Sequence, residues 1–186
     1  MHVVGITGSI ASGKTTVAHL MAGRKDPLFS ADKIVSNLYK KKYFINILVK
    51  KFNLNGKQKI KKQIRLVLEE NKKNFYKLET IIHPLVRKEM KIFLRKKNKL
   101  LFLEIPLLIE NKLNKYFDKV IFVDTKKKTR LERYIKRNGN KKIFNLLNKR
   151  QLSSNIKKKI CDYTINNNNS LQILKKTVKN FIKTYE

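Results

Sequence analysis

Short apolar runs without alternation recur along the chain. Four of them are His2–Thr7, Leu28–Ala31, Leu100–Ile105 and Val120–Val123, and Tyr163–Ile165 is a fifth candidate. A short continuous apolar run is typical of a strand that is buried on both faces of a parallel sheet. Strands that alternate with helical segments indicate an α/β fold, so the pattern predicts a parallel β-sheet with helices on its faces.

Helical periodicity marks other segments. Thr15–Met21 predicts a helix directly after the first strand. Residues 35–98 contain no comparable strand run, and their apolar residues at helical spacing include Leu78, Ile81, Ile82, Leu85 and Val86. Pro84 lies within that pattern and predicts a kink or the start of a new helix. We therefore expect one domain, 1–186, with a core of residues 1–34 and 99–186 and a helical insertion at about 35–98.

The last segment has the pattern of an amphipathic helix. Its apolar residues are Leu171, Leu174, Val178, Phe181 and Ile182. Ser170 precedes them and suits an N-cap, since its hydroxyl can accept a hydrogen bond from an N–H of the first turn. We interpret this stripe as core packing and not as a binding site.

Charge is the unusual property of the 186-residue chain. Lys and Arg number 45 against 13 Asp and Glu, a formal net charge of +32. One explanation is a basic protein that binds nucleic acid. The other is a compositional bias, which we favour because the lysines occur in every segment and no RNA-binding motif is present. In either case the protein attracts anionic ligands.

Cysteine content and hydropathy indicate a cytoplasmic protein without a membrane partner. Cys161 is the one cysteine, which excludes an internal disulfide. The longest apolar stretch, Leu100–Ile109, is interrupted by Glu104 and is too short to span a bilayer. A glycine-rich motif follows Met1 within a few residues, which argues against a signal peptide.

This glycine-rich motif predicts a phosphate-binding loop. It reads Gly8, Ser9, Ile10, Ala11, Ser12, Gly13, Lys14 and Thr15, which matches G-x-x-x-x-G-K-[ST], and Thr16 follows. Glycines let the backbone curl so that successive N–H groups bind phosphate oxygens, and the next helix adds the positive end of its dipole. Lys14 would reach the β- and γ-phosphates of ATP, and the Thr15 hydroxyl would bind Mg²⁺. We expect residues 8–16 to bind ATP.

Three carboxylates lie at the carboxyl ends of predicted strands, where ligands of open α/β sheets bind. Asp32 follows the second strand, and we predict that it is the catalytic base, with an N-cap role as the alternative. Glu104 lies late in the third strand and could hold a Mg²⁺-bound water, with a structural ion pair as the alternative. Asp124 follows the fourth strand and is more typical of a cap or turn.

A small phosphate-loop protein with a helical insertion after its second strand is more typical of a metabolite kinase than of a motor or a GTPase. The nucleotide-specific sequence N-K-x-D is absent from the chain. This analogy indicates the class of enzyme but not its substrate.

Several segments together resemble the dephospho-CoA kinase family. The opening from Gly5 to Lys14 is similar to that of these enzymes, and Ala31 to Ile34 is similar to their D-A-D-x-I segment. The stretch from Leu78 to Arg87 is very close to L-E-x-I-x-H-P-x-V-R, and Pro106 to Glu110 resembles P-L-L-F-E. The remaining matches, in chain order, are Phe117-Asp118, Arg133 with Arg137, Gln151 with Lys157, and Asp162 to Asn167. The resemblance covers nearly the whole chain.

The resemblance implies a reaction and a layout. ATP would phosphorylate the ribose 3′-hydroxyl of dephospho-CoA to give CoA and ADP, the last step of coenzyme A biosynthesis, with Mg²⁺ as cofactor. The fold would be a P-loop nucleotide kinase core with a helical substrate-binding insertion and a short mobile lid, at about residues 134–150. We expect a monomer whose partners are ATP and dephospho-CoA, without a specific nucleic acid.

The resemblance also implies roles for single residues. By position, Asp32 matches the catalytic aspartate, Lys14 the lysine of the loop, and Arg137 a lid residue that contacts ATP phosphates. Asn167 would contact the nucleotide. The residues expected to contact the acceptor are His83, Pro84, Arg87, Pro106 and Leu107.

The sequence departs from the family pattern at several positions. Ser9 and Ala11 replace glycines of the loop, and Ser30 replaces the first Asp of D-A-D. Lys59-Ile60 stands where the family has a D-R pair, Leu147 replaces a lid arginine, and Arg130 stands where Gln is common. Another small-metabolite P-loop kinase, of the nucleoside monophosphate kinase type, therefore stays open as an alternative.

Overall fold

Two compact units make up the chain. The computed structural model describes residues 2–23, 25–71 and 73–183. The first unit comprises Met1–Ser30 and Lys96–Glu186, and the second comprises Ala31–Arg95. Each unit has its own cluster of buried apolar side chains. The phosphate loop therefore belongs to the first unit, whereas Asp32 belongs to the second.

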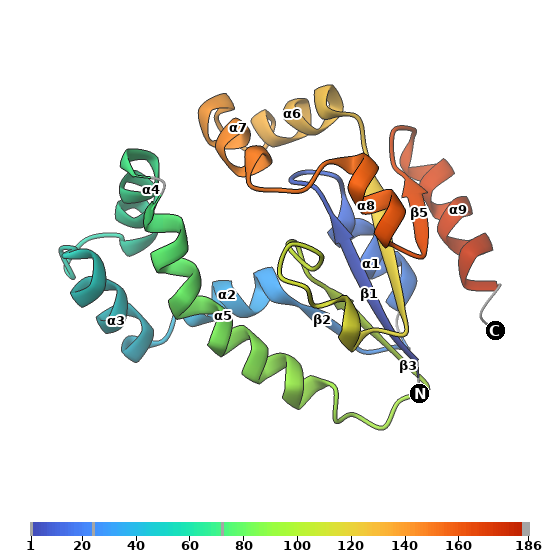
Figure 1. Ribbon diagram of the computed structural model, residues 1–186, viewed down its shortest axis with the longest axis horizontal. Coiled ribbons are helices and arrows are strands. Elements are labelled where there is room, and N and C mark those ends of the chain that lie inside the picture. Colours follow the sequence, from blue (N-terminus) through green and yellow to red (C-terminus); the bar gives the residue numbers. More distant parts are fainter. Residues whose placement is uncertain (1, 24, 72, 184–186) are drawn as a thin grey trace. The chain divides into compact units, whose positions relative to one another are not determined.

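A five-stranded parallel sheet forms the centre of the first unit, within the described residues (Figure 1). Its strands are β1 (His2–Gly8), β2 (Leu28–Ser30), β3 (Leu100–Glu104), β4 (Lys119–Asp124) and β5 (Tyr163–Asn166). The order across the sheet is β2-β3-β1-β4-β5, and every neighbouring pair is parallel. All five apolar runs thus form strands, and the predicted α/β fold with a parallel sheet is confirmed.

Strand register brings several carboxyl ends together where the phosphate loop begins. Ile6 of β1 pairs with Glu104 of β3, and Gly8 pairs with Val123 of β4. Ser30, the last residue of β2, pairs with Glu104 from the other side. Since β1 lies at the centre of the sheet, its loop emerges beside the ends of β3 and β4, where ligands of such sheets bind.

Helices of the first unit connect and follow its strands along the chain. They are α1 (Lys14–Ala22), α6 (Lys127–Ile135), α7 (Lys141–Lys149), α8 (Ser154–Ile160) and α9 (Leu171–Lys183), with a 3₁₀ turn η1 at Asn114–Tyr116. The buried side chains of α1 and α9 share one core with strand residues, for example Val17 and Val178 with Ile121. The predicted first and last helices are therefore present.

The last helix agrees with its predicted stripe except at its start. Ser170 Oγ accepts a hydrogen bond from Ile173 N at 3.4 Å, as an N-cap does. Leu174 and Val178 are buried, whereas Leu171 is 53% exposed. The prediction of a buried Leu171 is thus wrong, because the buried stripe of the helix begins at Leu174.

Two aspartates fix the amino ends of strands. Asp118 accepts a hydrogen bond from Val3 N at 2.7 Å through Oδ2, and Asp162 accepts one from Val120 N at 2.8 Å. Strand-end N–H groups need such acceptors when no neighbouring strand supplies one. Both aspartates belong to segments that resemble the family, and their contacts here are structural.

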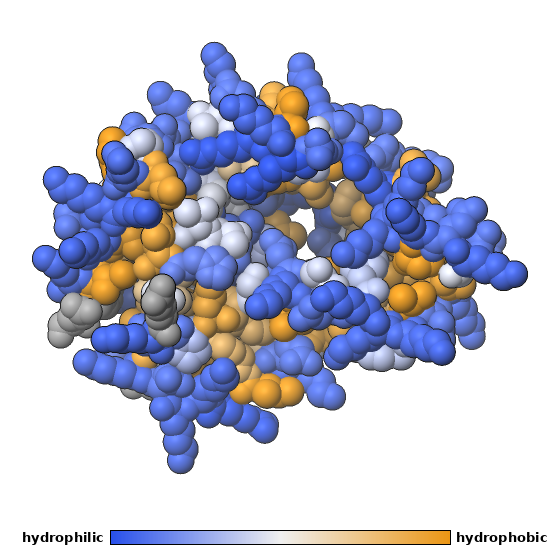
Figure 2. Space-filling model, turned by 180° about the vertical axis from the view of Figure 1, so that it is seen from behind, coloured by the Kyte–Doolittle hydropathy of each residue, from blue (hydrophilic) through white to orange (hydrophobic). Residues whose placement is uncertain are grey.

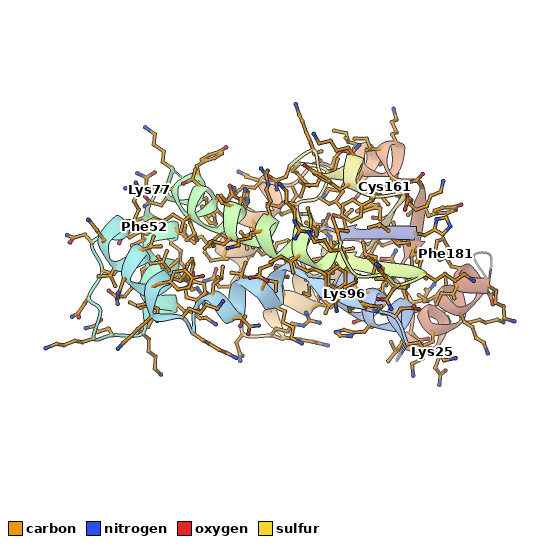
Figure 3. All side chains as sticks on the ribbon, turned by 90° about the horizontal axis from the view of Figure 1, so that it is seen from below. Lys25, Phe52, Lys77, Lys96, Cys161 and Phe181 are labelled. Carbon is orange, nitrogen blue, oxygen red and sulfur yellow. The ribbon has the colours of Figure 1, made fainter. Side chains whose placement is uncertain are left out.

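The second unit is helical, with no strand among residues 31–71 and 73–95. Its helices are α2 (Ala31–Leu38), α3 (Lys42–Phe52), α4 (Ile60–Glu70) and α5 (Lys73–Phe93). Its core contains the buried residues Leu38, Phe44, Leu48, Ile60 and Ile64. Lys77 of α5 places its ammonium 5.7 Å from the ring centroid of Phe52 in α3 (Figure 3), a cation–π contact between the two helices.

Helix α5 runs through Pro84 as one 21-residue helix. Of the two outcomes expected at this proline, the start of a new helix does not occur. Proline removes one backbone hydrogen bond from a helix interior. Leu78, Ile81, Ile82 and Leu85 pack against the core of the unit on both sides of Pro84. This packing explains why the helix continues.

Hydrophilic side chains dominate the face drawn in Figure 2, with smaller apolar patches between them. Such a surface agrees with the charged composition of the chain. Within the part of the chain that the structure describes, no helix is both long enough and apolar enough to cross a bilayer.

Candidate active site

The phosphate loop curls through two residues with left-handed backbone. Ala11 has a φ of 59° and Gly13 a φ of 89°. Gly13 cannot be replaced without strain, because its φ is costly for other residues and because a Cβ there would lie 2.2 Å from Asn167 Nδ2. Ala11 adopts a similar φ despite its Cβ, so this position carries strain that a glycine would not.

The carbonyl of Ser12 is held from outside the loop by three donors. Thr125 Oγ1 donates to it at 2.9 Å, Asn167 Nδ2 at 2.8 Å and Arg133 Nη1 at 3.5 Å. In a planar trans peptide the C=O and the next N–H point in opposite directions. The Gly13 N–H is therefore directed away from these donors, as the binding of an anion in the loop requires.

Electrostatics favour an anion at this loop. Lys14 begins α1, and no acidic residue occupies the first turn of that helix. The helix N-terminus adds partial positive charge to that of the lysine. Arg130 and Arg133, both in α6, donate hydrogen bonds to backbone carbonyl oxygens of the loop. Burial lowers the pKa of Arg130, and the nearby Asp124 charge opposes that shift.

Glu104 joins the loop helix to the end of β2. Its side chain is 1% exposed. Oε1 accepts a hydrogen bond from Thr15 Oγ1 at 2.5 Å, and Oε2 accepts one from Ser30 Oγ at 2.9 Å. The alternative expected from the sequence was a structural ion pair, whereas the described contacts of the carboxylate are to hydroxyl groups. Ser30, the residue that departs from D-A-D, is thus a partner of Glu104.

These oxygens match the chemistry of magnesium. Mg²⁺ prefers carboxylate, hydroxyl and phosphate oxygens, and it usually binds through one or two protein groups plus waters and substrate phosphates. Thr15 and Glu104 supply a hydroxyl and a carboxylate beside the phosphate loop. Within the described residues no group of three or more His, Cys, Asp or Glu could hold a metal by itself. A site completed by nucleotide phosphates fits this arrangement.

Asn167 and Arg137 differ in their surroundings. Asn167 is 6% exposed, and its amide nitrogen donates a hydrogen bond to the Ser12 carbonyl. Arg137 is exposed and lies beyond the last residue of α6, where its N–H donates to Tyr134 O at 3.2 Å. The structure therefore brings Asn167 to the phosphate loop and leaves Arg137 on the α6–α7 connection, within the predicted lid.

Pro106 and Leu107 lie in the turn after β3, separated from the strand by Ile105, and both are half-buried. The Pro106 carbonyl accepts a hydrogen bond from Thr7 Oγ1 at 3.2 Å, which ties this turn to β1. The Leu107 carbonyl accepts one from Asn111 Nδ2 at 2.9 Å. Both residues lie at the same edge of the sheet as the phosphate loop.

The remaining predicted residues belong to the second unit. Asp32 is the second residue of α2 and is exposed, so it lies inside the helix and not at the N-cap. His83, Pro84 and Arg87 lie in α5, where His83 is half-buried and the other two are exposed. A spacing of four residues places His83 and Arg87 on one face of the helix.

Comparison with known proteins decides the family. The sequence model of dephospho-CoA kinase matches residues 2–172. The chain belongs to the dephospho-CoA kinase family. It is 35% identical over 192 residues to a dephospho-CoA kinase of Bartonella henselae, covering 99% of this chain and 98% of the relative. It is 34% identical over 191 residues to that of Fusobacterium nucleatum, covering 98% and 97%.

Solved structures agree with this membership. The protein TT1252 from Thermus thermophilus superposes with a TM-score of 0.80 at 25% identity, covering all of this chain and 98% of that one. Dephospho-CoA kinase from Campylobacter jejuni gives a TM-score of 0.66 at 25% identity, with coverage of 98% and 96%. A shikimate kinase from Acinetobacter baumannii, at 16% identity and a TM-score of 0.57, shares the fold alone.

For this dephospho-CoA kinase family member, sequence reasoning missed some residues that contact the loop. Thr125 was not considered, although it directly follows Asp124 at the carboxyl end of a strand, which is a usable signal. Gln151 was noticed only as a motif residue, yet its Oε1 accepts a hydrogen bond from Ile10 N at 2.9 Å. Arg130 was noted as a departure, and it is 6% exposed, with its Nη1 3.4 Å from the Ile10 carbonyl oxygen.

Proposed function

We propose that this protein transfers the γ-phosphoryl group of ATP to the ribose 3′-hydroxyl of dephospho-CoA, giving CoA and ADP in the last step of coenzyme A biosynthesis. The observation that carries the proposal is the Ser12 carbonyl, held outward by buried Thr125 and Asn167. This arrangement prepares the loop amides for phosphate before any nucleotide arrives. Membership of the dephospho-CoA kinase family supports the choice of acceptor.

ATP would bind with its phosphates over residues 8–16. Loop N–H groups and the N-terminus of α1 would bind the phosphate oxygens, and the Lys14 ammonium would contact the β- and γ-phosphates. Thr15 and Glu104 would hold Mg²⁺, which neutralises phosphate charge when bound. Asn167 would support ATP binding in two ways, by holding the Ser12 carbonyl of the loop and by contacting the nucleotide.

Asp32 would act as the general base. The acceptor 3′-oxygen forms a bond to the γ-phosphorus, the bond between that phosphorus and the β,γ-bridging oxygen breaks, and ADP leaves with the electron pair. The proton of the 3′-hydroxyl passes to the Asp32 carboxylate. Arg137 would stabilise charge on the transferred group from a lid at residues 134–150.

The acceptor would bind to the helical unit and to the turn after β3. His83 and Arg87 on one face of α5 would contact dephospho-CoA, with Pro84 between them restricting the local backbone. Pro106 and Leu107 would line the acceptor side of the sheet edge. We expect a cytoplasmic monomer whose positive charge attracts both anionic substrates.

A substrate panel tests the reaction. Purified protein with ATP and Mg²⁺ should phosphorylate dephospho-CoA, with formation of CoA followed by chromatography. Adenosine and AMP belong in the same panel, because other small-metabolite kinases share this fold. Faster turnover of either one would reject dephospho-CoA as the substrate, and faster turnover of AMP would favour the nucleoside monophosphate kinase type.

Asp32→Asn tests the base. We expect kcat to fall by about 10²-fold or more, since a positioned general base contributes on this scale, while ADP affinity stays unchanged. Asp26→Asn is the matched control, because it removes a carboxylate from the loop before β2 and should leave kcat as in the parent protein. An Asp32→Asn enzyme with parental kcat would show that another group takes the proton.

A further inference from the structure

The N–H of Ile10, in the phosphate loop, already has a partner. Gln151 Oε1 accepts a hydrogen bond from Ile10 N at 2.9 Å across a separation of 141 residues. Gln151 lies two residues beyond the end of α7 and is half-buried. A backbone N–H bound by a side chain keeps a fixed direction, which constrains the neighbouring peptides of the loop.

A buried ion pair holds the backbone beside Gln151. Leu152 N donates to Glu110 Oε1 at 2.9 Å, and Lys157 Nζ lies 2.8 Å from the same oxygen. The Lys157 side chain has no exposure and that of Glu110 is 13% exposed. Loss of either partner would leave an uncompensated buried charge, and the hydrogen bond from Leu152 N ties the backbone next to Gln151 to this pair.

A second contact reaches Ile10 from the other end of the predicted lid. Arg130 Nη1, in α6, lies 2.9 Å from Asn148 Oδ1 in α7 and 3.4 Å from the Ile10 carbonyl. Arg130 Nε also donates to Thr125 O at 3.0 Å, so the guanidinium is held at the end of β4. Ile10 is thus contacted by residues on both sides of segment 134–150, and the bond that its N–H donates to Gln151 is the shorter of the two.

We propose that Gln151 is a positioning residue that connects the carboxyl end of the predicted lid to the phosphate loop and holds the loop in its nucleotide-binding curl. The proposal rests on the proposed function only as far as the loop binds a nucleotide. Gln151 affects nucleotide binding by fixing the Ile10 N–H, and it has no contact with the acceptor in this proposal. Its loss should weaken nucleotide binding and leave the acceptor site as it is.

Gln151→Met tests this proposal, because methionine has a similar length and lacks the acceptor oxygen. We expect the Kd for ADP, measured by calorimetry without any acceptor, to rise about 3- to 10-fold, the loss typical of one hydrogen bond. The KM for ATP should rise with it, and the KM for dephospho-CoA should stay unchanged. Gln172→Met, an exposed glutamine in α9, is the matched control and should bind ADP like the parent protein.

Gln151→Glu tests whether the hydrogen bond itself matters, because glutamate keeps an acceptor oxygen and loses the amide group. A carboxylate oxygen can still accept from Ile10 N–H, so at about 0.5 M salt, which screens part of the added charge, we expect Gln151→Glu to bind ADP more tightly than Gln151→Met does. Parental ADP affinity in Gln151→Met would overturn the proposal, as would equal weakening by Met and Glu. A parallel rise of KM for both substrates would also overturn it, because it indicates general loosening.

The two proposals fail in different ways. The ADP titration contains no dephospho-CoA, so a parent protein that does not phosphorylate dephospho-CoA would reject the proposed reaction and leave the Gln151 comparison valid. A parent protein that phosphorylates dephospho-CoA, with Gln151→Met binding ADP normally, would reject Gln151 alone.

Discussion

The phosphate loop owes its shape to side chains from distant strands more than to its own glycines. Ala11 holds a positive φ that costs free energy for any residue with a Cβ. Thr125 and Asn167, at the ends of β4 and β5, compensate by fixing the Ser12 carbonyl. A buried polar group that is fully hydrogen-bonded specifies one conformation, and here it specifies the one in which Gly13 N–H can bind an anion.

Thr125→Val tests this support, because valine has the same shape without the hydroxyl. We expect ADP to bind about 3- to 10-fold more weakly, since one hydrogen bond of about 1 kcal/mol is lost while Asn167 keeps the second. Calorimetric titration with ADP measures the change. Thr125→Ser retains the hydroxyl and should bind ADP close to the parent affinity. Equal weakening by valine and serine would mean that packing of the methyl group matters and the hydroxyl does not.

Cys161 provides a test of burial. The residue is 8% exposed, and burial raises the pKa of its thiol to about 11, with Lys157 opposing the shift and Asp162 and Glu110 adding to it. The thiol should thus stay protonated at pH 8 and resist iodoacetamide in the folded protein, because the thiolate is the reactive species. Mass spectrometry should show alkylation only after denaturant is added. Rapid alkylation of the native protein would contradict this burial.

The same shift has a consequence for stability. The folded-state pKa of Cys161 lies above its ordinary value of 9.0, so the folded state keeps its proton where the unfolded state loses it. The contribution of the protonated Cys161 thiol to the free energy of unfolding is fully present below pH 9, and it is lost as pH rises toward about 11. Cys161→Ala should remove this part of the alkaline loss of stability.

At the scale of elements, prediction succeeded where the signal lies in consecutive residues. The strands β1 to β4 carry their apolar runs in consecutive residues, which explains why they were located, whereas the edge strand β5 has one buried residue, Ile165, and was a weaker candidate. The four separate helices of the second unit were not resolved, because a helical period alone does not show where turns such as the one after Leu38 interrupt it. Thr125 was missed as a loop contact because the strand order brings it to the loop, and Gln151 was missed because it meets Ile10 across a separation of 141 residues.

Pro84→Ala tests the role of α5. Alanine restores the missing backbone donor in the helix interior, so we expect the free energy of unfolding to rise by about 1 kcal/mol, measured by denaturant titration. We also expect the KM for dephospho-CoA to rise while the KM for ATP is unchanged, because Pro84 lies between His83 and Arg87. Lys88→Ala, at an exposed site on the same helix, serves as the control. Unchanged KM values would remove Pro84 from the acceptor site.

For the whole molecule, a net charge of +32 raises the question of whether nucleic acid is a specific partner. Charge distributed over the surface attracts phosphates in general, and the phosphate loop then selects a nucleotide by backbone geometry. Two kinds of binding should therefore respond differently to salt. Contacts with a polyanion release counterions and weaken steeply, whereas a phosphate held by fixed amides beside Lys14 is less screened.

Binding to a random-sequence RNA should show this difference. We expect its affinity to fall by about 10³-fold or more between about 50 and 200 mM salt, with no preference among sequences, because only phosphate contacts contribute. ADP affinity should change by less than about 10-fold over the same range. At the higher salt the RNA should not inhibit phosphorylation of dephospho-CoA. Tight, sequence-dependent RNA binding that persists at about 200 mM salt would instead assign the positive surface to a nucleic-acid partner.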